Sequence, residues 1–300
     1  MQDHGGEGNV KTFETRWEDQ EGTTFFIQGW EPDNDAPKAF IALIHGLGDH
    51  SARFAHIGKV MAEAGYALVG FDLRGHGKSG GPRGHASSLE AYMQDIRQFF
   101  QRMEQHYPDI PHFLYGHSLG GLLALAYAIQ YGTGLKGVMV TGAALRASLQ
   151  EQKAKIAMVR LLGSIVPAMT LPSGLDPATL SRDPAVVQAY INDPLVHYST
   201  SLGFGKAALN AIDLCFARAS EFPVPLLIMH GKGDKLTYPS GSEHFAKLAG
   251  ATGGDVTLKL WDGLYHELHN EPEKAEVFKF MIGWLDEHLR QGGSASHQKL

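Results

Sequence analysis

The sequence predicts an α/β protein in which helices flank a mostly parallel central sheet and a helical insertion interrupts the pattern. Short apolar runs alternate with helical segments along most of the 300-residue chain. This alternation is typical of a parallel sheet covered by helices. Between residues 144 and 222 the alternation stops, and five prolines divide the segment. Because strands are predicted on both sides of this break, we expect one core with an insertion rather than two independent domains.

The predicted strands are short and almost entirely apolar, as expected for strands buried on both faces. Before the break they cover residues 23–30, 39–44, 66–71, 112–115 and 136–140, with helices over 52–64, 89–106 and 122–131. After it, strands are predicted over 224–229 and 255–260 and helices over 240–249 and 272–289. We therefore divide the chain into a core of residues 12–143 and 223–290, a cap of 144–222, and flexible tails at 1–11 and 291–300.

The composition excludes several classes of protein. The chain is 43% hydrophobic and 19% charged, with a net charge of -6 and no block of like charge, which argues against disorder and against a nucleic-acid partner. Its single cysteine, Cys215, rules out an intrachain disulfide. The first residues lack the pattern of a signal peptide, and no window is long and apolar enough to span a bilayer. We expect a cytoplasmic protein and leave peripheral contact with a membrane open.

The motif Gly116-x-Ser118-x-Gly120 predicts a nucleophilic serine. It lies between a predicted strand and a predicted helix, where a tight turn holds the serine oxygen exposed. Glycines on both sides of the serine relieve the close packing that such a turn forces. A serine hydroxyl also needs a base that removes its proton. The alternative interpretation is a glycine-rich turn with an inert serine.

Asp234 and His266 are the predicted partners of this serine. In this architecture the order along the chain is serine, acid, histidine. Asp234 follows the strand 224–229 and His266 follows the strand 255–260. Both therefore lie at the carboxyl edge of the sheet, where active sites of open α/β sheets form. Asp262 and His269 are the alternatives, and His288, in the last helix, is expected to be solvated.

The segment His45-Gly46-Leu47-Gly48-Asp49 follows the buried strand 39–44. A tetrahedral intermediate needs backbone N–H donors that point at its oxyanion. In this architecture one donor follows the nucleophile and the other comes from the loop after an early strand. We predict Leu119 and Leu47 as these donors.

We predict neither a metal nor a cofactor. His266 and His269 have the spacing of a metal pair, but no neighbouring cysteine or carboxylate cluster completes a zinc site. Residues 75–79 end in Gly-Lys-Ser, yet Asp72 stands where a phosphate-binding loop requires glycine.

The chain resembles the monoacylglycerol lipases of the α/β-hydrolase superfamily over residues 12–288. The resemblance rests on motifs in the core and in the cap. They are residues 45–54, 71–79, 116–121, 180–184, 193–197, 230–234 and 265–269. The cap motifs are the most selective, because they lie outside the core that the whole superfamily shares. The resemblance implies an α/β-hydrolase fold with Ser118, Asp234 and His266 as the catalytic triad, and Leu47 and Leu119 as oxyanion donors.

The resemblance also implies a group of polar residues at the headgroup end of the pocket, formed by Asp49, Arg53 and His269. Asp49 stands where relatives often carry glutamate, and Leu47 where some carry alanine. The second difference leaves the oxyanion role intact, since that role uses the backbone N–H. Both differences bear on headgroup selectivity.

The cap contains an apolar stretch over residues 156–169 that bears on the substrate. Its apolar residues occupy more than one face of the predicted helix, so we expect it to line an acyl pocket, to contact lipid aggregates, or to do both. A helix that only packs on the core is the simpler alternative. The residues assigned to the cap and acyl pocket are Ile156, Val159, Leu162, Ile165 and Val166.

These observations predict a serine esterase that hydrolyses monoacylglycerols to glycerol and fatty acid through an acyl-enzyme on Ser118. A carboxylesterase of broad scope or a lysophospholipase is the nearest alternative. A peptidase or an acyltransferase on the same scaffold is less favoured. From another class, the chain could be an inactive hydrolase that only binds a ligand. Acyl chain length and oligomeric state are not readable from the sequence.

Overall fold

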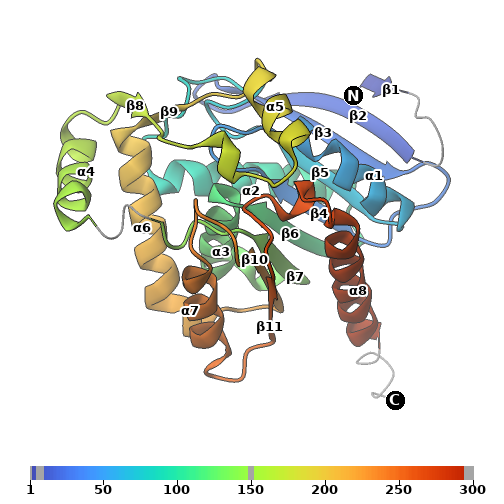
Figure 1. The fold of residues 1–300 in the computed structure, drawn as a ribbon. Coiled ribbons are helices and arrows are strands. Elements are labelled where there is room, and N and C mark those ends of the chain that lie inside the picture. Colours follow the sequence, from blue (N-terminus) through green and yellow to red (C-terminus); the bar gives the residue numbers. More distant parts are fainter. Residues whose placement is uncertain (1, 5–9, 148–151, 294–300) are drawn as a thin grey trace.

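A nine-stranded sheet with helices on both faces forms the centre of the computed structural model, which describes residues 2–4, 10–147 and 152–293 (Figure 1). Within these residues the strand order is β1-β2-β3-β5-β4-β6-β7-β10-β11. The six strands from β5 to β11 run parallel, whereas β1, β2 and β3 add an antiparallel edge. The predicted α/β-hydrolase fold class, with its mostly parallel sheet, is confirmed.

The strands match the apolar runs of the sequence to within two or three residues. Their bounds are β1 Gln2–His4, β2 Val10–Glu18, β3 Thr24–Pro32, β4 Phe40–Ile44, β5 Ala67–Phe71, β6 His112–His117, β7 Gly137–Thr141, β10 Leu226–Gly231 and β11 Val256–Trp261. The sequence analysis did not predict β1 and β2. Polar residues alternate with Val10, Phe13 and Trp17 in β2, so this edge strand lacks the continuous apolar run of the central strands.

The sheet separates two hydrophobic cores, one on each of its faces, and helices cover both. Helices α1 (Ala55–Glu63) and α8 (Lys274–Gly293) cover one face. The other face is covered by α2 (Leu89–His106), α3 (Leu119–Tyr131) and α7 (Pro239–Gly250). Neighbouring residues of a strand point to opposite cores: Phe40 and Ala42 belong to one, Ile41 and Leu43 to the other. This burial on both faces explains why the central strands read as unbroken apolar runs.

Between β7 and β10 the chain forms the segment that was predicted as a cap. Its elements are α4 Lys153–Ile165, β8 Thr170–Pro172, a 3-10 helix Pro177–Thr179, α5 Pro184–Asn192, β9 Ser199–Ser201, α6 Leu202–Arg218 and a 3-10 helix Ala219–Glu221. The aspartate before Pro177 and the aspartate before Pro184 accept hydrogen bonds from the first turns of their helices, so both prolines begin helices. The short strands β8 and β9 pair with each other; β8 is exposed, whereas β9 is half-buried and ends in the buried Ser201.

Helix α6 belongs to the core as much as to the cap. Phe204, Ala211 and Cys215 are buried in the same cluster as α3. In Figure 1, α6 lies between α3 and α4, so α4 is the outermost layer on that side of the molecule. Parts of the two predicted flexible tails, residues 1–11 and 291–300, belong to regular elements. Residues 10 and 11 belong to β2, residues 2–4 pair with β2, and α8 extends to Gly293, while 1, 5–9 and 294–300 lie outside the described residues.

Gly120 allows α3 to approach β4 closely, and its replacement tests that constraint. A Cβ at this position would lie 2.0 Å from the Ile44 carbonyl oxygen, whereas a Cβ at Gly283, in α8, would meet no atom within 4 Å. We expect Gly120→Ala to lower the free energy of unfolding by more than about 2 kcal/mol. Gly283→Ala is the matched control and should raise it by about 0.5–1 kcal/mol. Urea unfolding measures both, and equal stability of the two variants would contradict this account.

Candidate active site

Ser118 lies at the turn between β6 and α3, in a strained backbone conformation. Its φ is 55°, the only positive φ of a non-glycine residue in the described part of the chain. A Cβ at Gly116 would lie 2.3 Å from the Gly120 carbonyl oxygen, so the turn requires glycine there. The Ser118 N–H donates to the Thr141 carbonyl at 2.9 Å, and its own carbonyl accepts from Leu122 and Ala144 at 3.0 Å. The surrounding backbone thereby holds a conformation that costs on the order of 1–3 kcal/mol.

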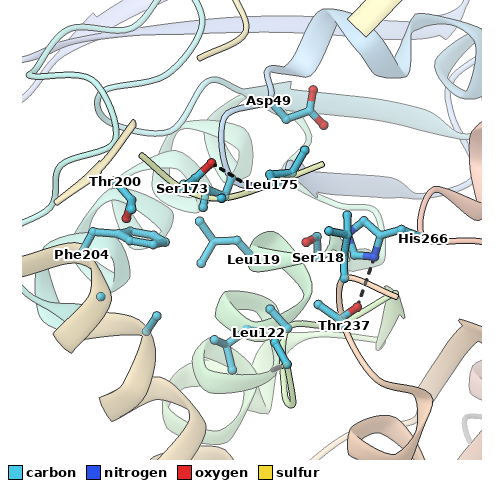
Figure 2. Close-up of a pocket in the computed structure, with 18 of the residues that line it drawn as sticks. Asp49, Ser118, Leu119, Leu122, Ser173, Leu175, Thr200, Phe204, Thr237 and His266 are labelled. Carbon is cyan, nitrogen blue, oxygen red and sulfur yellow. Dashed lines mark hydrogen bonds between the residues drawn. The ribbon is translucent and has the colours of Figure 1, made fainter. Parts of the chain in front are cut away.

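Asp234 and His266 meet beside this turn. The His266 Nδ1–H donates to Asp234 Oδ2 at 2.7 Å, and both side chains are buried. Asp234 follows β10 and His266 follows β11, neighbouring parallel strands whose ends bring the two together. Ser118 and His266 line the same pocket, and Figure 2 shows the serine beside the histidine ring. Because Nδ1 carries the proton toward Asp234, Nε2 is the ring nitrogen left to act as a base.

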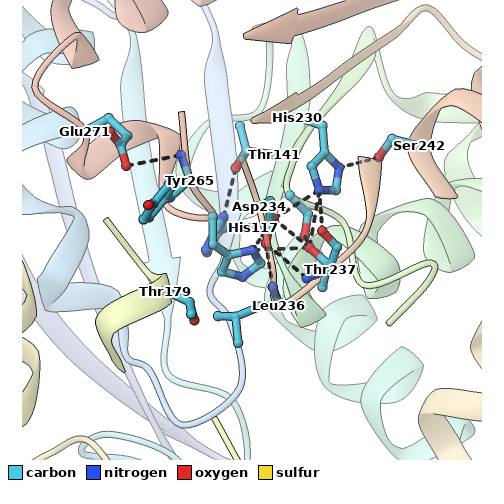
Figure 3. A network of polar contacts seen from close by, with 12 residues as sticks. His117, Thr141, Thr179, His230, Asp234, Leu236, Thr237, Ser242, Tyr265 and Glu271 are labelled. Carbon is cyan, nitrogen blue, oxygen red and sulfur yellow. Dashed lines mark hydrogen bonds and ion pairs between the residues drawn. The ribbon is translucent and has the colours of Figure 1, made fainter. Parts of the chain in front are cut away.

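Asp234 has two further partners that the sequence analysis did not predict, His230 and Thr237 (Figure 3). His230 Nε2 lies 3.0 Å from Asp234 Oδ2, and Thr237 Oγ1 lies 2.9 Å from the same oxygen. The N–H groups of Leu236 and Thr237 donate to the other oxygen, Oδ1, at 2.8 and 3.1 Å. His230 stands four residues before Asp234 at the end of β10, and that spacing was the available signal. These donors leave the carboxylate little freedom to turn away from His266.

Electrostatics favour an ionised Asp234 and a more basic His266. Burial opposes the charge on Asp234, but His266 and His230 outweigh it and hold the pKa of this carboxyl below its usual range. Burial also disfavours the charged form of His266, yet the Asp234 charge and hydrogen bond outweigh it and raise the pKa of the imidazole above its usual value. The pair is therefore arranged to accept a proton on His266.

The alternative acid and the alternative base are not joined to this pair. Asp262 is exposed and lies 2.7 Å from Lys232. The ring of His269 is buried and stacks on Phe54, with a centroid distance of 4.6 Å. The prediction that His288 is solvated is wrong. Its side chain is buried, with Nδ1 2.7 Å from the Trp284 carbonyl and Nε2 3.1 Å from Asp255, because α8 turns this residue toward the sheet.

The predicted oxyanion donors both border the pocket that holds Ser118. Leu119 is the first residue of α3, where N–H groups have no partner within the helix. The Gly46 carbonyl oxygen lies 2.8 Å from His45 Nδ1, and the Leu73 N–H donates to His45 Nε2 at 2.9 Å. The carbonyl and N–H of one peptide group point in opposite directions. Because the Gly46 carbonyl points at His45, the N–H of the same peptide group, that of Leu47, points away from His45.

Of the three predicted headgroup residues, only Asp49 lines the pocket. Arg53 lies behind it and donates to Asp49 Oδ1 at 3.0 Å and to both oxygens of Glu267 at 2.8 Å. His269 is also outside the lining, because its ring packs between Phe54 and His117. Glu267, which the sequence analysis missed, does line the pocket.

The pKa values of the two buried carboxyls of this group shift in opposite directions. Burial disfavours the charge on both Asp49 and Glu267. For Glu267, the bidentate contact with Arg53 outweighs burial and lowers the pKa to about 2. For Asp49, burial dominates and raises the pKa of the carboxyl. The headgroup end therefore presents carboxylate oxygens whose charge Arg53 largely balances.

The pocket is a cavity of about 530 Å³ with a mostly apolar wall. Much of that wall comes from α6, through Leu202, Phe204, Ala208, Leu209 and Ile212. Sequence reasoning missed these residues because it treated residues 144–222 as a helical insertion and did not define this helix. In Figure 2, Phe204 and Thr200 stand at the end of the pocket away from His266.

The predicted acyl-pocket residues of the cap mostly face elsewhere. Val159 lines the pocket, whereas Ile156, Leu162, Ile165 and Val166 are not among its lining residues. Ile165 and Val166 are 65% and 42% exposed. The acyl-pocket assignment is therefore corrected for these residues: α4 packs on α6 from outside, and only its inner face reaches the cavity.

The described residues contain no group of three or more His, Cys, Asp or Glu side chains arranged to hold a metal ion. None of the described helices combines the length and the apolar character that crossing a membrane requires.

Known proteins resemble this chain over most of its length. A family model described as serine aminopeptidase, S33, matches residues 35–273. A monoacylglycerol lipase of Mycolicibacterium smegmatis is 33% identical over 269 residues, which cover 89% of this chain and 95% of that protein. The chain belongs to the monoacylglycerol lipase family of α/β-hydrolases. It is thus a carboxylic ester hydrolase, as predicted.

Two further proteins are similar to this chain. An uncharacterized abhydrolase domain-containing protein of Dictyostelium discoideum is 38% identical over 274 residues, and the chain spans 29% of its length. The crystal structure of a Paleococcus ferrophilus monoacylglycerol lipase superposes with a TM-score of 0.79 at 31% identity. The match covers 92% of this chain and 99% of that one.

Buried histidines near Ser118, with lowered pKa values, predict a loss of stability in mild acid. Burial lowers the pKa of His45 from 6.5 to about 3. The unfolded chain therefore binds more protons than the folded one between these values, and the free energy of unfolding falls as pH drops from about 7 toward 3. Urea unfolding at pH 7 and pH 5 should show this decline. His45→Gln should reduce it, whereas His244→Gln, at an exposed position, should not; an unchanged decline in His45→Gln would contradict the assignment.

Proposed function

We propose that this protein hydrolyses monoacylglycerols to glycerol and a fatty acid through an acyl-enzyme on Ser118. The observation that carries the proposal is the meeting of three features in one pocket. These are the strained turn at Ser118, the His266–Asp234 pair, and the long apolar wall from α6. The names of the monoacylglycerol lipases that resemble this chain support the same substrate.

In the proposed mechanism His266 Nε2 takes the Ser118 proton as the hydroxyl attacks the ester carbonyl. Leu47 and Leu119 donate their N–H groups to the oxyanion of the tetrahedral intermediate. Collapse of the intermediate breaks the ester C–O bond, and His266 returns the proton to the departing alcohol. A water molecule, deprotonated by His266, then attacks the acyl-enzyme, and a second collapse releases the fatty acid and restores Ser118. Asp234 keeps the ring oriented and stabilises the imidazolium in both halves.

The two ends of the pocket support an ester of one acyl chain with a small polar alcohol. The apolar wall suits an alkyl chain, and the polar end at Asp49 and Glu267 offers acceptors for hydroxyl groups. Arg53 balances these carboxylates, so neither is free to receive the ammonium group of a peptide substrate. An ester is therefore favoured over the peptide that the description of the matching family model suggests.

We further propose that residues 144–222 act as a cap whose outer face touches lipid aggregates. Met158, Leu161, Ile165, Val166 and Met169 are each between 42% and 65% exposed, and they follow one another along α4 and the turn after it. A cluster of exposed large apolar side chains is costly in water and typical of contact with lipid. This surface lies next to β8, whose Leu171 also lines the pocket.

Replacement of Ser118 tests the mechanism. Ser118→Ala should lower kcat on monoacylglycerol and on a soluble p-nitrophenyl ester by several orders of magnitude, because no other group supplies the nucleophile.

A panel of mono-, di- and triacylglycerols, lysophospholipid, p-nitrophenyl esters of varied length and an aminoacyl anilide defines the substrate. Preference for lysophospholipid, for short esters or for the anilide would replace the proposed substrate. Full activity of Ser118→Ala would reject the mechanism, and no activity of the wild type would indicate a ligand-binding protein.

A charge on the cap surface tests its contact with lipid. Ile165→Glu should lower activity on micellar monoacylglycerol at least several-fold more than activity on a soluble short-chain ester. Leu258→Glu is the matched control, because Leu258 is 39% exposed on β11, away from the cap. It should leave the ratio of the two activities unchanged. An equal loss on both substrates in Ile165→Glu would argue against lipid contact.

A further inference from the structure

Two short runs of the cap adjoin α5, and apart from Leu180, which lines the pocket, they have no role in the chemistry described above. The first is Leu180-Ser181-Arg182-Asp183-Pro184, and the second is Asp193-Pro194-Leu195-Val196-His197. Among their charged residues, Asp183 caps α5, and neither Arg182 nor Asp193 lines the pocket. Their contacts lead instead to the loops that hold His266 and Leu47.

The first run binds the segment that follows His266. The Glu267 N–H donates to the Leu180 carbonyl at 2.8 Å, and Ser181 Oγ donates to the Asn270 carbonyl at 3.0 Å. Arg182 donates from its backbone N–H and its Nε to the two oxygens of Glu271, at 2.9 and 2.6 Å.

Glu271 carries the effect of Arg182 to the residue before the histidine. It is fully buried, and its Oε1 also accepts the N–H of Tyr265 at 3.2 Å (Figure 3). The cap therefore holds the backbone at Tyr265 and at Glu267, immediately before and after His266.

The second run binds the oxyanion loop in the same manner. The His197 N–H donates to the Gly48 carbonyl at 3.1 Å, and His50 Nε2 lies 2.9 Å from Asp193 Oδ2. Gly48 has a φ of +72°, and a Cβ there would lie 2.3 Å from the His197 carbonyl oxygen. The loop that presents the Leu47 N–H is thus built for close approach of the cap backbone.

Helix α5 joins the two runs as a short, capped spacer. Asp183 accepts from the Ala185 N–H at its start, and Asp193 Oδ1 accepts from the Leu195 N–H beyond its end. Between them, the buried ring of Tyr190 lies 4.6 Å from the guanidinium of Arg53, which itself bonds Asp49 and Glu267. The spacer therefore also contacts the ion-pair group that connects the two loops.

From this arrangement we infer that residues 180–197 form a fixed brace that positions the catalytic histidine and the oxyanion donor relative to Ser118. Arg182 and Asp193 are its positioning residues: they act on turnover through His266 and Leu47 without touching the substrate. The inference rests on the proposed catalytic roles of those residues. The cap then has two parts. One is the brace, residues 180–197; the other is α4, which contacts α6 and forms an ion pair with it between Arg160 and Asp213 at 2.6 Å.

The test compares Arg182→Met and Asp193→Ala with Arg160→Met as the matched control, all on soluble p-nitrophenyl butyrate. Arg160→Met also removes an arginine–carboxylate pair of the cap, but one between α4 and α6. Active sites are counted with a fluorophosphonate, so that kcat refers to competent enzyme. We expect kcat to fall 10- to 100-fold in both brace variants, as small displacements of reacting groups do, with KM changed less than about 3-fold. Arg160→Met should keep the wild-type kcat, and Arg182→Lys and Asp193→Asn should recover part of the loss.

Arg182→Met leaves the buried Glu271 without its cation, so loss of the fold is the main risk. Ser181→Ala removes one hydrogen bond to the His266 loop and leaves no charge unpaired, and it should lower kcat several-fold. If all three brace variants keep kcat within 2-fold while Ser118→Ala is inactive, the brace is overturned. A loss of kcat equal to that in Arg160→Met, or a rise in KM alone, also overturns it. Turnover by Ser118→Ala would reject the catalytic roles themselves.

Discussion

The backbone turn at Ser118 is the constraint on which the site depends. Its φ of 55° is possible because Gly116 and Gly120 have no side chain. The backbones of β6, α3 and β4 can therefore pack directly against one another. The same turn places Leu119 at the start of α3, so that the proposed nucleophile and one proposed oxyanion donor are consecutive residues. One local geometry thus fixes two elements of the proposed mechanism, and the sheet supplies the others: β4 leads to Leu47, β10 to Asp234 and β11 to His266.

Around this turn burial lowers the pKa of several histidines, and the buried carboxylates are paired. Burial holds the pKa of His117 and of His269 well below the usual value, so neither competes with His266 for the proton. Asp234 and Glu267 stay charged in the interior because each has donors for both oxygens. His266, whose pKa is raised, therefore differs from His117 and His269 in favouring the proton. Because burial lowers the pKa of imidazoles such as these two, the free energy of unfolding is expected to fall in acid.

Much of the site could be predicted because its signals are local in sequence. Ser118 lies between Gly116 and Gly120, two residues away from each. Asp234 and His266 were predicted because each follows the end of a predicted strand. Partners that come from distant segments carried no such signal. Glu267 meets Arg53 across 214 residues, and Arg182 meets Glu271 across 89. His269 and Arg53 are in the correct region, but burial, which the sequence does not report, sets them behind the pocket wall.

By itself the sequence determined the layered α/β fold, the strand ends that carry the triad, and the helical insertion. Period and composition encode these features directly, because strands buried on both faces must be apolar and tight turns need glycine. Only the tertiary structure decided which face of α4 reaches the cavity, that α6 forms much of the apolar pocket wall, and that the runs beside α5 contact the loops of Leu47 and His266. These depend on how helices of similar amphipathic character pack against one another. Such packing is fixed by shape and by contacts between segments far apart in the chain.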